Sequence, residues 1–538
     1  MTAADYIVLA AYFAVMLWIG IRYAPYMKAF STYFAGERAL PWWVAGLSFF
    51  MSYVSSLSIV VYAGIGYQFG LVSLTLYWVT VPACLISTLL LARRWQRAVA
   101  LTPIEFLEKR YHLLVRQLFA WTGVPLRIVD DGLKLLALAV FLSRGVGVPL
   151  DLTLIIIGGV VISYTLLGGV WAVSLTDAVQ FVIMLIALGL LLGLAVADAG
   201  GIKSIVANTP PDFWKPLSGP YTIGFWVALA LLALMAFSSN WALIQRFYST
   251  GSARAAKGAG LLATACFIFL PPIWIFAGMV ARVLINGLSD PQFALAELAV
   301  KTLPSGVFGL MVAALMAAAM STLSADYNVV ASVLTVDFFR RFNIIRSPKL
   351  GWARLTTAIV GAVSLIIALV VSHYGFAIFD VMVTVFGLLT APMTLPLAAG
   401  LLTRKVGWRS AVGGYVAGLV AALVVILVKG RFSGYGFQTM AIFATSAATL
   451  AAMILIEGVT RKSAAEQERV SAFFAAMAEA GVSANSPAHL PSPLVIAGTA
   501  TGFIGAVVAL VGLVWRENLT LIAGLVMGAI GILGWRRA

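Results

Sequence analysis

Charged residues are scarce in this chain. Lysine, arginine, aspartate and glutamate together make up 10% of its 538 residues, whereas hydrophobic residues make up 62%, and the mean hydropathy is +1.02. A soluble protein carries roughly a quarter charged residues. The scarcity of charge therefore excludes a soluble globular domain and indicates a protein that lies largely within a membrane.

The residues that build disulfide frameworks and metal centres are also rare. The chain has two cysteines, Cys84 and Cys266, and both lie in apolar segments, which predicts core packing rather than a disulfide framework. The three histidines, His112, His373 and His489, show no metal-ligand spacing. No nucleophile elbow, phosphate loop or zinc motif occurs either, so we expect that the protein is not an enzyme.

Apolar runs long enough to cross a bilayer recur along the whole chain. A hydrocarbon core of about 30 Å needs about 20 residues of helix, and we find about fifteen such runs. They lie at 4–22, 42–67, 71–93, 122–146, 150–170, 172–198, 221–245, 257–286, 303–337, 353–374, 376–402, 407–428, 437–457, 493–515 and 517–534. The predicted fold class is therefore an all-α polytopic membrane protein.

The basic residues alternate between loops. The net charge of +15 comes mainly from loops at 93–116, 246–257, 340–349, 404–409, 461–462 and 536–537. The positive-inside rule places these loops in the cytoplasm, with the N-terminus outside and the C-terminus inside. The positive charge is thus a signal of topology in an inner (plasma) membrane, and it does not indicate a nucleic-acid partner.

Hydroxyl side chains cluster in the apolar run from about Gly309 to Val336. Ser321, Thr322 and Ser324 fall within about one helical turn. In hydrocarbon such a cluster must face protein or an ion. Helical hydroxyls bond back to carbonyls three or four residues earlier, and this sets several oxygens side by side as a hard cation prefers. The alternative is that the hydroxyls satisfy themselves or join two helices.

A second polar group interrupts the run at 42–67. Four serines and one tyrosine crowd into the segment from Ser52 to Ser58. These residues could support an unwound helix, whose carbonyls coordinate ions and whose half-helix ends face a substrate. An ordinary helix with a small-residue packing face is the alternative.

Ionisable residues inside the runs are costly and are candidates for function. Asp177 lies near the start of its run, where it either complements the helix dipole or binds an ion. Lys134 can pair across one turn with Asp130 or Asp131, and mutual neutralisation competes with a contact to a substrate or proton. Asp326 has no basic residue nearby in the sequence; it either shares a helix face with the hydroxyl cluster or is solvated near the cytoplasmic end.

Several short motifs occur together in one order. They are Tyr33–Trp43, Gly168-Gly169 with Ala172-Val173, Thr176-Asp177 with Gln180, Asn240 followed by Gln245–Tyr248, Met320–Ser324 and Thr335–Phe338. In this order they resemble the sodium:solute symporter family, whose members carry sugars, sialic acid, proline or pantothenate. The resemblance runs from the first span to about Gly418.

The resemblance implies an architecture as well as a class. It implies two inverted five-helix repeats similar to the leucine transporter, at about 42–198 and 221–402, within a single membrane transport domain of residues 1–538. The ten-helix core would span 42–402 and be followed by accessory helices at 403–457. A cytoplasmic loop at 458–492, which contains a short surface helix from Ala464 to Ala480, and a C-terminal helical hairpin at 493–538 would complete the chain.

The resemblance also implies binding residues. A sodium ion would bind the carbonyls of Met51, Val54 and Ala318 and the hydroxyls of Ser321 and Thr322. In some relatives a second sodium lies near the positions of Asp177, Ser321 and Ser324, but Ala325 replaces one hydroxyl here, so we expect one sodium. The predicted substrate residues are Ser52, Tyr53, Ser55, Ser56, Ser58 and Asn240.

The expected function is therefore sodium-coupled symport of a small polar organic solute into the cell by alternating access. Sodium is the only metal expected, and the protein is expected to work as a monomer. The solute stays open between a sugar, sialic acid or a similar organic acid. A membrane solute sensor and a proton-coupled symporter, with Asp177 or Asp326 as the titrating group, are the alternatives.

Overall fold

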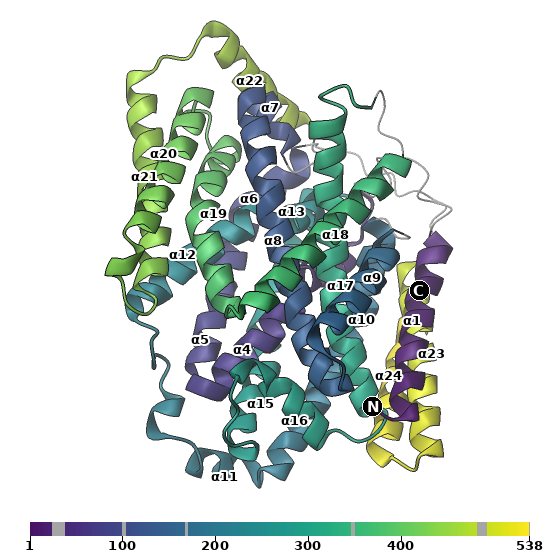
Figure 1. Ribbon diagram of the computed structural model, residues 1–538. Coiled ribbons are helices and arrows are strands. Elements are labelled where there is room, and N and C mark those ends of the chain that lie inside the picture. The colour runs from purple at the N-terminus through teal and green to yellow at the C-terminus, as the bar shows by residue number, and fades with distance from the viewer. Residues whose placement is uncertain (24–37, 99–103, 167–169, 346–349, 481–491, 537–538) are drawn as a thin grey trace.

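The computed structural model describes the chain except for residues 24–37, 99–103, 167–169, 346–349, 481–491 and 537–538. Within these limits the regular secondary structure consists of helices, which stack into one bundle (Figure 1). Residues 33–37 of the predicted loop motif at Tyr33–Trp43 and the pair Gly168-Gly169 lie outside the described residues. The all-α fold class is confirmed.

The helices of the first half cover the first seven predicted runs. They are α1 (Ala3–Tyr23), α3 (Trp42–Met51), α4 (Ser56–Phe69), α5 (Val72–Trp78), α6 (Thr80–Arg97), α7 (Glu105–Arg110), α8 (Leu113–Val146), α9 (Leu150–Thr165), α10 (Val170–Asp198), α11 (Gly201–Ala207), η3 (Pro211–Trp214), α12 (Ile223–Ser239) and α13 (Trp241–Tyr248).

The helices of the second half continue in the same manner. They are α14 (Ala253–Phe269), α15 (Pro271–Leu284), η4 (Pro291–Phe293), α16 (Ala294–Thr302), α17 (Val307–Val333), η5 (Leu334–Phe339), α18 (Leu350–Tyr374), α19 (Ile378–Leu402), α20 (Trp408–Leu427), η6 (Lys429–Arg431), α21 (Gly436–Val459), α22 (Ala464–Glu479), α23 (Pro493–Val514) and α24 (Asn518–Arg536). The short surface helix predicted at Ala464 is therefore present as α22.

Eleven helices in the described part of the chain are long and apolar enough to cross a membrane, and three bent pairs bring the number to 14. The sequence prediction of about fifteen is one higher because it counted α8 and α9 separately. Their axes differ by 117°, at Gly147 in the left-handed region (φ 76°), followed two residues later by Pro149. The sequence also placed the start of α8 nine residues too late, at 122 instead of Leu113.

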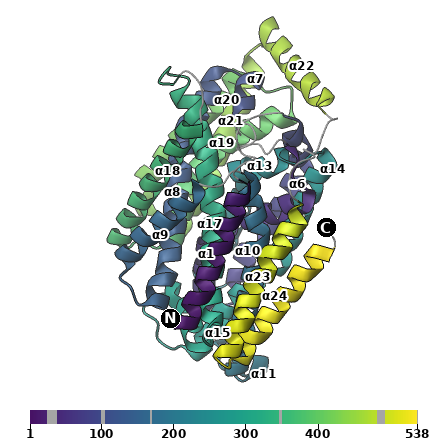
Figure 2. The ribbon, with the colours of Figure 1, turned by 90° about the vertical axis from the view of Figure 1, so that its right-hand side faces the viewer.

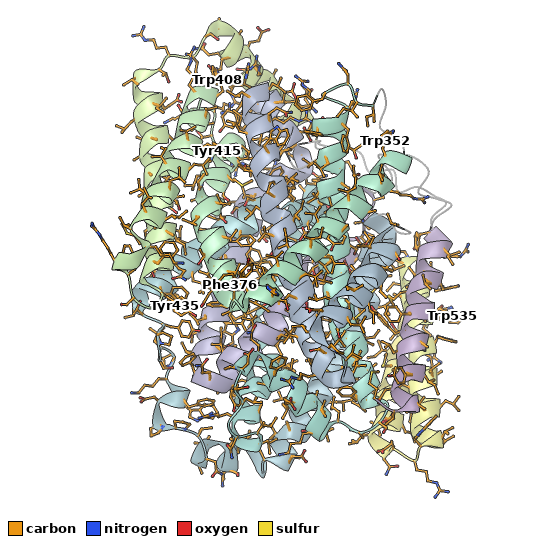
Figure 3. All side chains as sticks on the ribbon, viewed as in Figure 1. Trp352, Phe376, Trp408, Tyr415, Tyr435 and Trp535 are labelled. Atoms are coloured by element: carbon orange, nitrogen blue, oxygen red, sulfur yellow. The ribbon has the colours of Figure 1, made fainter. Side chains whose placement is uncertain are left out.

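Aromatic side chains mark the two ends of neighbouring spans. Trp408, at the start of α20, lies near the upper end of the bundle in Figure 3, whereas Phe376 and Tyr435, just before α19 and α21, lie much lower. Tryptophan and tyrosine prefer the two interfaces of a bilayer. The positions of these three residues therefore agree with antiparallel crossings by α19, α20 and α21.

The helix α17 is the centre of the bundle, because it is buried along its whole length. Its sequence allows this, since alanine and glycine let neighbouring helices approach closely. The carboxylate of Asp5 on α1 accepts hydrogen bonds from the backbone N–H groups of Gly306 and Gly309, both at 2.8 Å. The beginning of α17 is thereby tied to α1, which lies beside α23 in Figure 2.

Two of the bent pairs are broken helices. α3 and α4 bend by 54° across Ser52–Ser55, and α12 and α13 bend by 47° at Asn240. The break predicted within Ser52–Ser58 is therefore real, and the alternative of an ordinary helix there is wrong. These two breaks position the residues described next.

Candidate functional site

The break between α3 and α4 releases backbone carbonyl groups. Ser55 caps α4: its side chain accepts the N–H of Ser58, and its own N–H donates to the Ser58 hydroxyl at 2.9 Å. In a continuous helix these two N–H groups would bond to the carbonyls of Met51 and Val54. The capping box diverts them, so both carbonyls stay available to a ligand.

The hydroxyl cluster on α17 is fully buried. Thr322 donates to the carbonyls of Ala318 and Ala319, both at 3.1 Å, as expected for a helical threonine. Ser321 Oγ is buried and has no hydrogen-bond partner among the described residues. A buried hydroxyl without a partner is costly, which makes Ser321 a candidate ligand for a guest.

The two halves of the predicted sodium site come from helices that touch. Both α3 and α4 contact α17, although Val54 and Ala318 are 264 positions apart in the sequence. Carbonyl and hydroxyl oxygens are the ligands that a hard cation prefers. The arrangement therefore offers an all-oxygen set between two elements of the bundle.

Asp177 lies beside this set rather than at a helix start. It is two turns into α10 and is fully buried, so the interpretation as a dipole-complementing residue is wrong. Its Oδ2 accepts a hydrogen bond from Ser48 of α3, and its Oδ1 has no partner in the described structure. The Ser321 hydroxyl faces this carboxylate, although no hydrogen bond joins the two groups.

Arg246 is a site residue that the sequence analysis missed. It was assigned to a basic cytoplasmic loop, but it lies on α13 and is 1% exposed. Its Nε donates to Ser48 Oγ at 2.6 Å, its Nη2 donates to Ser52 Oγ at 3.3 Å, and Nη2 lies 3.7 Å from Asp177 Oδ2. The guanidinium therefore balances the charge of Asp177 and joins the two broken helices.

A polar cavity opens between the two breaks. Its volume is about 120 Å³. Five of the six predicted substrate residues line it, namely Ser52, Tyr53, Ser55, Ser58 and Asn240. Ser56 is not among the lining residues, because its hydroxyl donates to the Lys134 carbonyl at 2.7 Å.

The cavity wall also contains residues that were not assigned to the solute. Asp130, Lys134, Tyr62, Tyr77 and Thr80 line it together with apolar side chains. The Tyr77 hydroxyl is buried without a hydrogen-bond partner among the described residues. The clue available in the sequence was the charged triplet Asp130, Asp131 and Lys134, but its orientation could not be derived without the packing of α8.

Asp326 is paired rather than solvated. It is 1% exposed, and its Oδ2 lies 2.6 Å from Lys134 Nζ. The interpretation that water solvates it near the cytoplasmic end is wrong. Lys134 also lies 2.8 Å from Asp130 Oδ2 and 3.2 Å from Asp131 Oδ1, so the predicted mutual neutralisation is present and includes a third acid.

Broken membrane helices whose ends face a polar cavity, beside a buried helix that carries hydroxyls, define the class of secondary transporters. The model of the sodium:solute symporter family matches residues 33–418 of this chain. The chain belongs to this family, and it is therefore a multi-pass protein of the plasma membrane. The family is one of transporters.

Named relatives are similar over most of the chain. Sodium/glucose cotransporter 2 of Rattus norvegicus is 24% identical over 494 residues, which cover 80% of this chain and 72% of the relative. The sodium/sialic acid symporter NanT of Aliivibrio fischeri is 26% identical over 449 residues, which cover 78% and 87%. Sodium/myo-inositol cotransporter 2 of Bos taurus is 26% identical over 477 residues, which cover 79% and 70%.

Two solved structures share the fold. A Na+-coupled sialic acid symporter in a substrate-bound, outward-open state has a TM-score of 0.75 at 21% identity, over 85% of this chain and 98% of that one. Mhp1, a nucleobase-cation-symport-1 family transporter, has a TM-score of 0.54 at 16% identity, over 82% and 98%. Both belong to the class of leucine-transporter-like folds, so this part of the prediction is confirmed.

Proposed function

We propose that this protein is a sodium-driven symporter that carries a small polar organic solute into the cell by alternating access. One observation carries the proposal: the carbonyls released at the α3–α4 break and the unpartnered Ser321 hydroxyl belong to helices in contact. An ion that binds both helices favours the conformations in which they are close. An ion shifts a conformational equilibrium only if its affinities for the two states differ. A site shared between the two helices binds the ion more tightly in the state in which these helices are close.

The proposed sodium ligands are the carbonyls of Met51, Val54 and Ala318 and the hydroxyls of Ser321 and Thr322. We further propose a stoichiometry of one sodium per cycle. Arg246 already balances the charge of Asp177, and Ser324 Oγ donates to the Ser321 carbonyl at 3.3 Å. A second cation at Asp177 would therefore face a buried guanidinium, which lowers its affinity.

The proposed solute is rich in hydrogen-bond donors, as sugars and polyols are. Asp130 lines the cavity, and beyond its contacts with Lys134 and Arg127 it has no partner in the described part of the chain. A carboxylate accepts hydrogen bonds and repels another carboxylate. Among the described residues that line the cavity, Lys134 is the only cation, and it has three carboxylate partners and little capacity left for an acid.

The membrane topology follows the basic loops. The N-terminus would lie outside and the C-terminus in the cytoplasm, with residues 42–402 as the transport core, 403–457 as accessory helices and 458–492 and 493–538 as the cytoplasmic loop and the hairpin. The beginning of α1 lies at the lower end of that helix and the end of α24 at its upper end (Figure 2), which supports termini on opposite sides of the membrane. The proposed functional unit is a monomer.

The proposal is tested by solute uptake into proteoliposomes under an inward sodium gradient, first with a panel of sugars, polyols and organic acids. Ser321→Ala and Thr322→Ala should each raise the sodium concentration for half-maximal uptake. Ser332→Ala is the matched control, because this buried hydroxyl lies on the same helix and donates to Val329 at 2.7 Å. Unchanged sodium dependence in both site variants would exclude the proposed ion site.

A further inference from the structure

Five charged side chains meet between α8 and α17. Lys134 Nζ lies 2.8 Å from Asp130 Oδ2, 3.2 Å from Asp131 Oδ1 and 2.6 Å from Asp326 Oδ2. Arg127 Nη1 lies 4.0 Å from Asp130 Oδ2. All five residues are buried. We name Arg127, Asp130, Asp131, Lys134 and Asp326 the charged cluster.

The charged cluster is unbalanced when every member is ionised. It has two cations and three carboxylates, so one negative charge is in excess. A buried charge without a partner costs several kcal/mol in a protein interior, and Asp131 and Asp326 are 0% and 1% exposed. The cluster therefore needs one further positive charge.

A metal ion does not fit this need. One carboxylate oxygen from each of the three acids lies within 4.8 Å of the others, but the Lys134 ammonium already contacts all three acids from that space. Its three N–H groups are matched by three carboxylates. Two oxygens remain without a donor among the described residues: Asp131 Oδ2 and Asp326 Oδ1.

We propose that the charged cluster binds one proton, shared between Asp131 and Asp326. A proton on one carboxyl turns it into an O–H donor to the other, so that both orphaned oxygens gain a partner. One oxygen of the Asp131 carboxyl and one of the Asp326 carboxyl lie within 4.8 Å of each other. A proton needs no additional space, and it removes the excess charge.

Other charged or titratable groups also face this pair. They are Arg127, Asp130 and Lys134 on α8, Tyr327 on α17, and Arg246 on α13. Phenols are ordinarily neutral and guanidinium groups ordinarily charged at physiological pH. Loss of the proton from the Asp131–Asp326 pair is therefore the change in charge that we expect as the pH rises.

The proton has a consequence for transport. Asp326 lies one helical turn after Thr322, so the α8–α17 contact adjoins the proposed sodium ligands. With the proton bound, the contact is neutral and the helices pack. Loss of the proton as the pH rises places two buried carboxylates against each other, which weakens the contact. We expect uptake to fall at alkaline pH for this reason.

The test is infrared spectroscopy of the full chain in lipid, which detects the carbonyl stretch of a protonated carboxylic acid. Wild type should show this band at neutral pH and lose it on alkaline titration. Asp131→Asn and Asp326→Asn should each abolish the band, because removal of either carboxylate balances the cluster. Asp5→Asn is the matched control: Asp5 Oδ1 already accepts two N–H groups, so the band should persist.

A wild-type spectrum without the band at neutral pH overturns the proposal, and so does a band that persists in either asparagine variant. An amine-bearing solute on Asp130 would then be the better source of positive charge. If an asparagine variant does not fold, Asp326→Glu replaces it and should shift the band. Uptake measured in parallel should fall with rising pH in wild type and Asp5→Asn, and stay flat in Asp326→Asn.

Discussion

The two broken helices turn through similar angles by different means. The 54° bend between α3 and α4 uses four non-helical residues, whereas the 47° bend between α12 and α13 uses only Asn240. At the second break the Asn240 N–H donates to Ala236, and the Asn240 carbonyl accepts the N–H of Ile244. Its side chain accepts the N–H groups of Ala242 and Leu243.

The comparison shows that a bend does not by itself make an ion site. At the first break, the serine capping box leaves the carbonyls of Met51 and Val54 without N–H donors. At the second, the Asn240 side chain takes the N–H groups of Ala242 and Leu243, so the carbonyls of Ser238 and Ser239 also lose their helical donors. The oxygens that bind a cation come from carbonyls that have lost their helical N–H donors, and the bend of the helix axis alone does not supply them. What distinguishes the first break is that α3 and α4 contact the hydroxyl-bearing helix α17, so we propose it as the ion-binding one. The second break positions Arg246.

The largest expected effect concerns the link between the two breaks. Arg246→Met removes the guanidinium that contacts Ser48, Ser52 and Asp177. This leaves a buried carboxylate unpaired, which typically costs about 3–5 kcal/mol. Thermal unfolding of the purified protein in detergent should show the loss.

The double variant Arg246→Met with Asp177→Leu sharpens this prediction. Replacement of both partners by apolar groups removes the unpaired charge, so the double variant should be more stable than Arg246→Met alone. If the two variants unfold at the same temperature, the Asp177–Arg246 pair does not stabilise the packing of α13 against α3.

The two breaks also differ in how far the sequence predicted them. Ser52–Ser58 was identifiable because four serines in an apolar run are unusual, and Thr322 bonds back as helical threonines do. Asp326 could not be paired from the sequence, because its partner Lys134 is 192 positions away and their proximity depends on the packing of α8 on α17. Arg246 was misassigned because Arg254 and Lys257 follow it and resemble the same basic loop.

The bundle as a whole was more predictable than its contacts. Hydropathy located the spans, because a backbone in hydrocarbon must form helices. It did not reveal that α17 is buried on every side, since a lipid-facing helix and a central helix are equally apolar. The burial follows from which helices surround Ala317–Ala319, and this is a property of the assembled bundle.

The next expected effect concerns the capping box of the first break. Ser55→Ala removes a cap worth about 1 kcal/mol. It also frees the Ser58 N–H, which donates to the Ser55 hydroxyl, to bond to the Val54 carbonyl instead. The helix then closes over a sodium ligand. The sodium concentration for half-maximal uptake should rise about fivefold.

A cap elsewhere provides the control. Ser252 caps α14 by accepting the Ala255 N–H at 3.1 Å, far along the chain from the proposed ligands. Ser252→Ala should leave the sodium dependence unchanged. An equal rise in both variants would mean that general destabilisation, and not the first break, controls sodium affinity.

The smallest expected effect concerns the second break. Asn240→Ala removes the cap of α13, which should lower stability by about 1 kcal/mol, while Asn240→Ser keeps a capping side chain. Because Asn240 lines the cavity, both variants should bind the solute more weakly, but neither should change the sodium concentration for half-maximal uptake. Thermal unfolding and uptake at varied sodium separate these effects. If Asn240→Ala weakens sodium binding as strongly as Ser55→Ala, both breaks contribute to the ion site, and the distinction drawn from the contact of α3 and α4 with α17 is wrong.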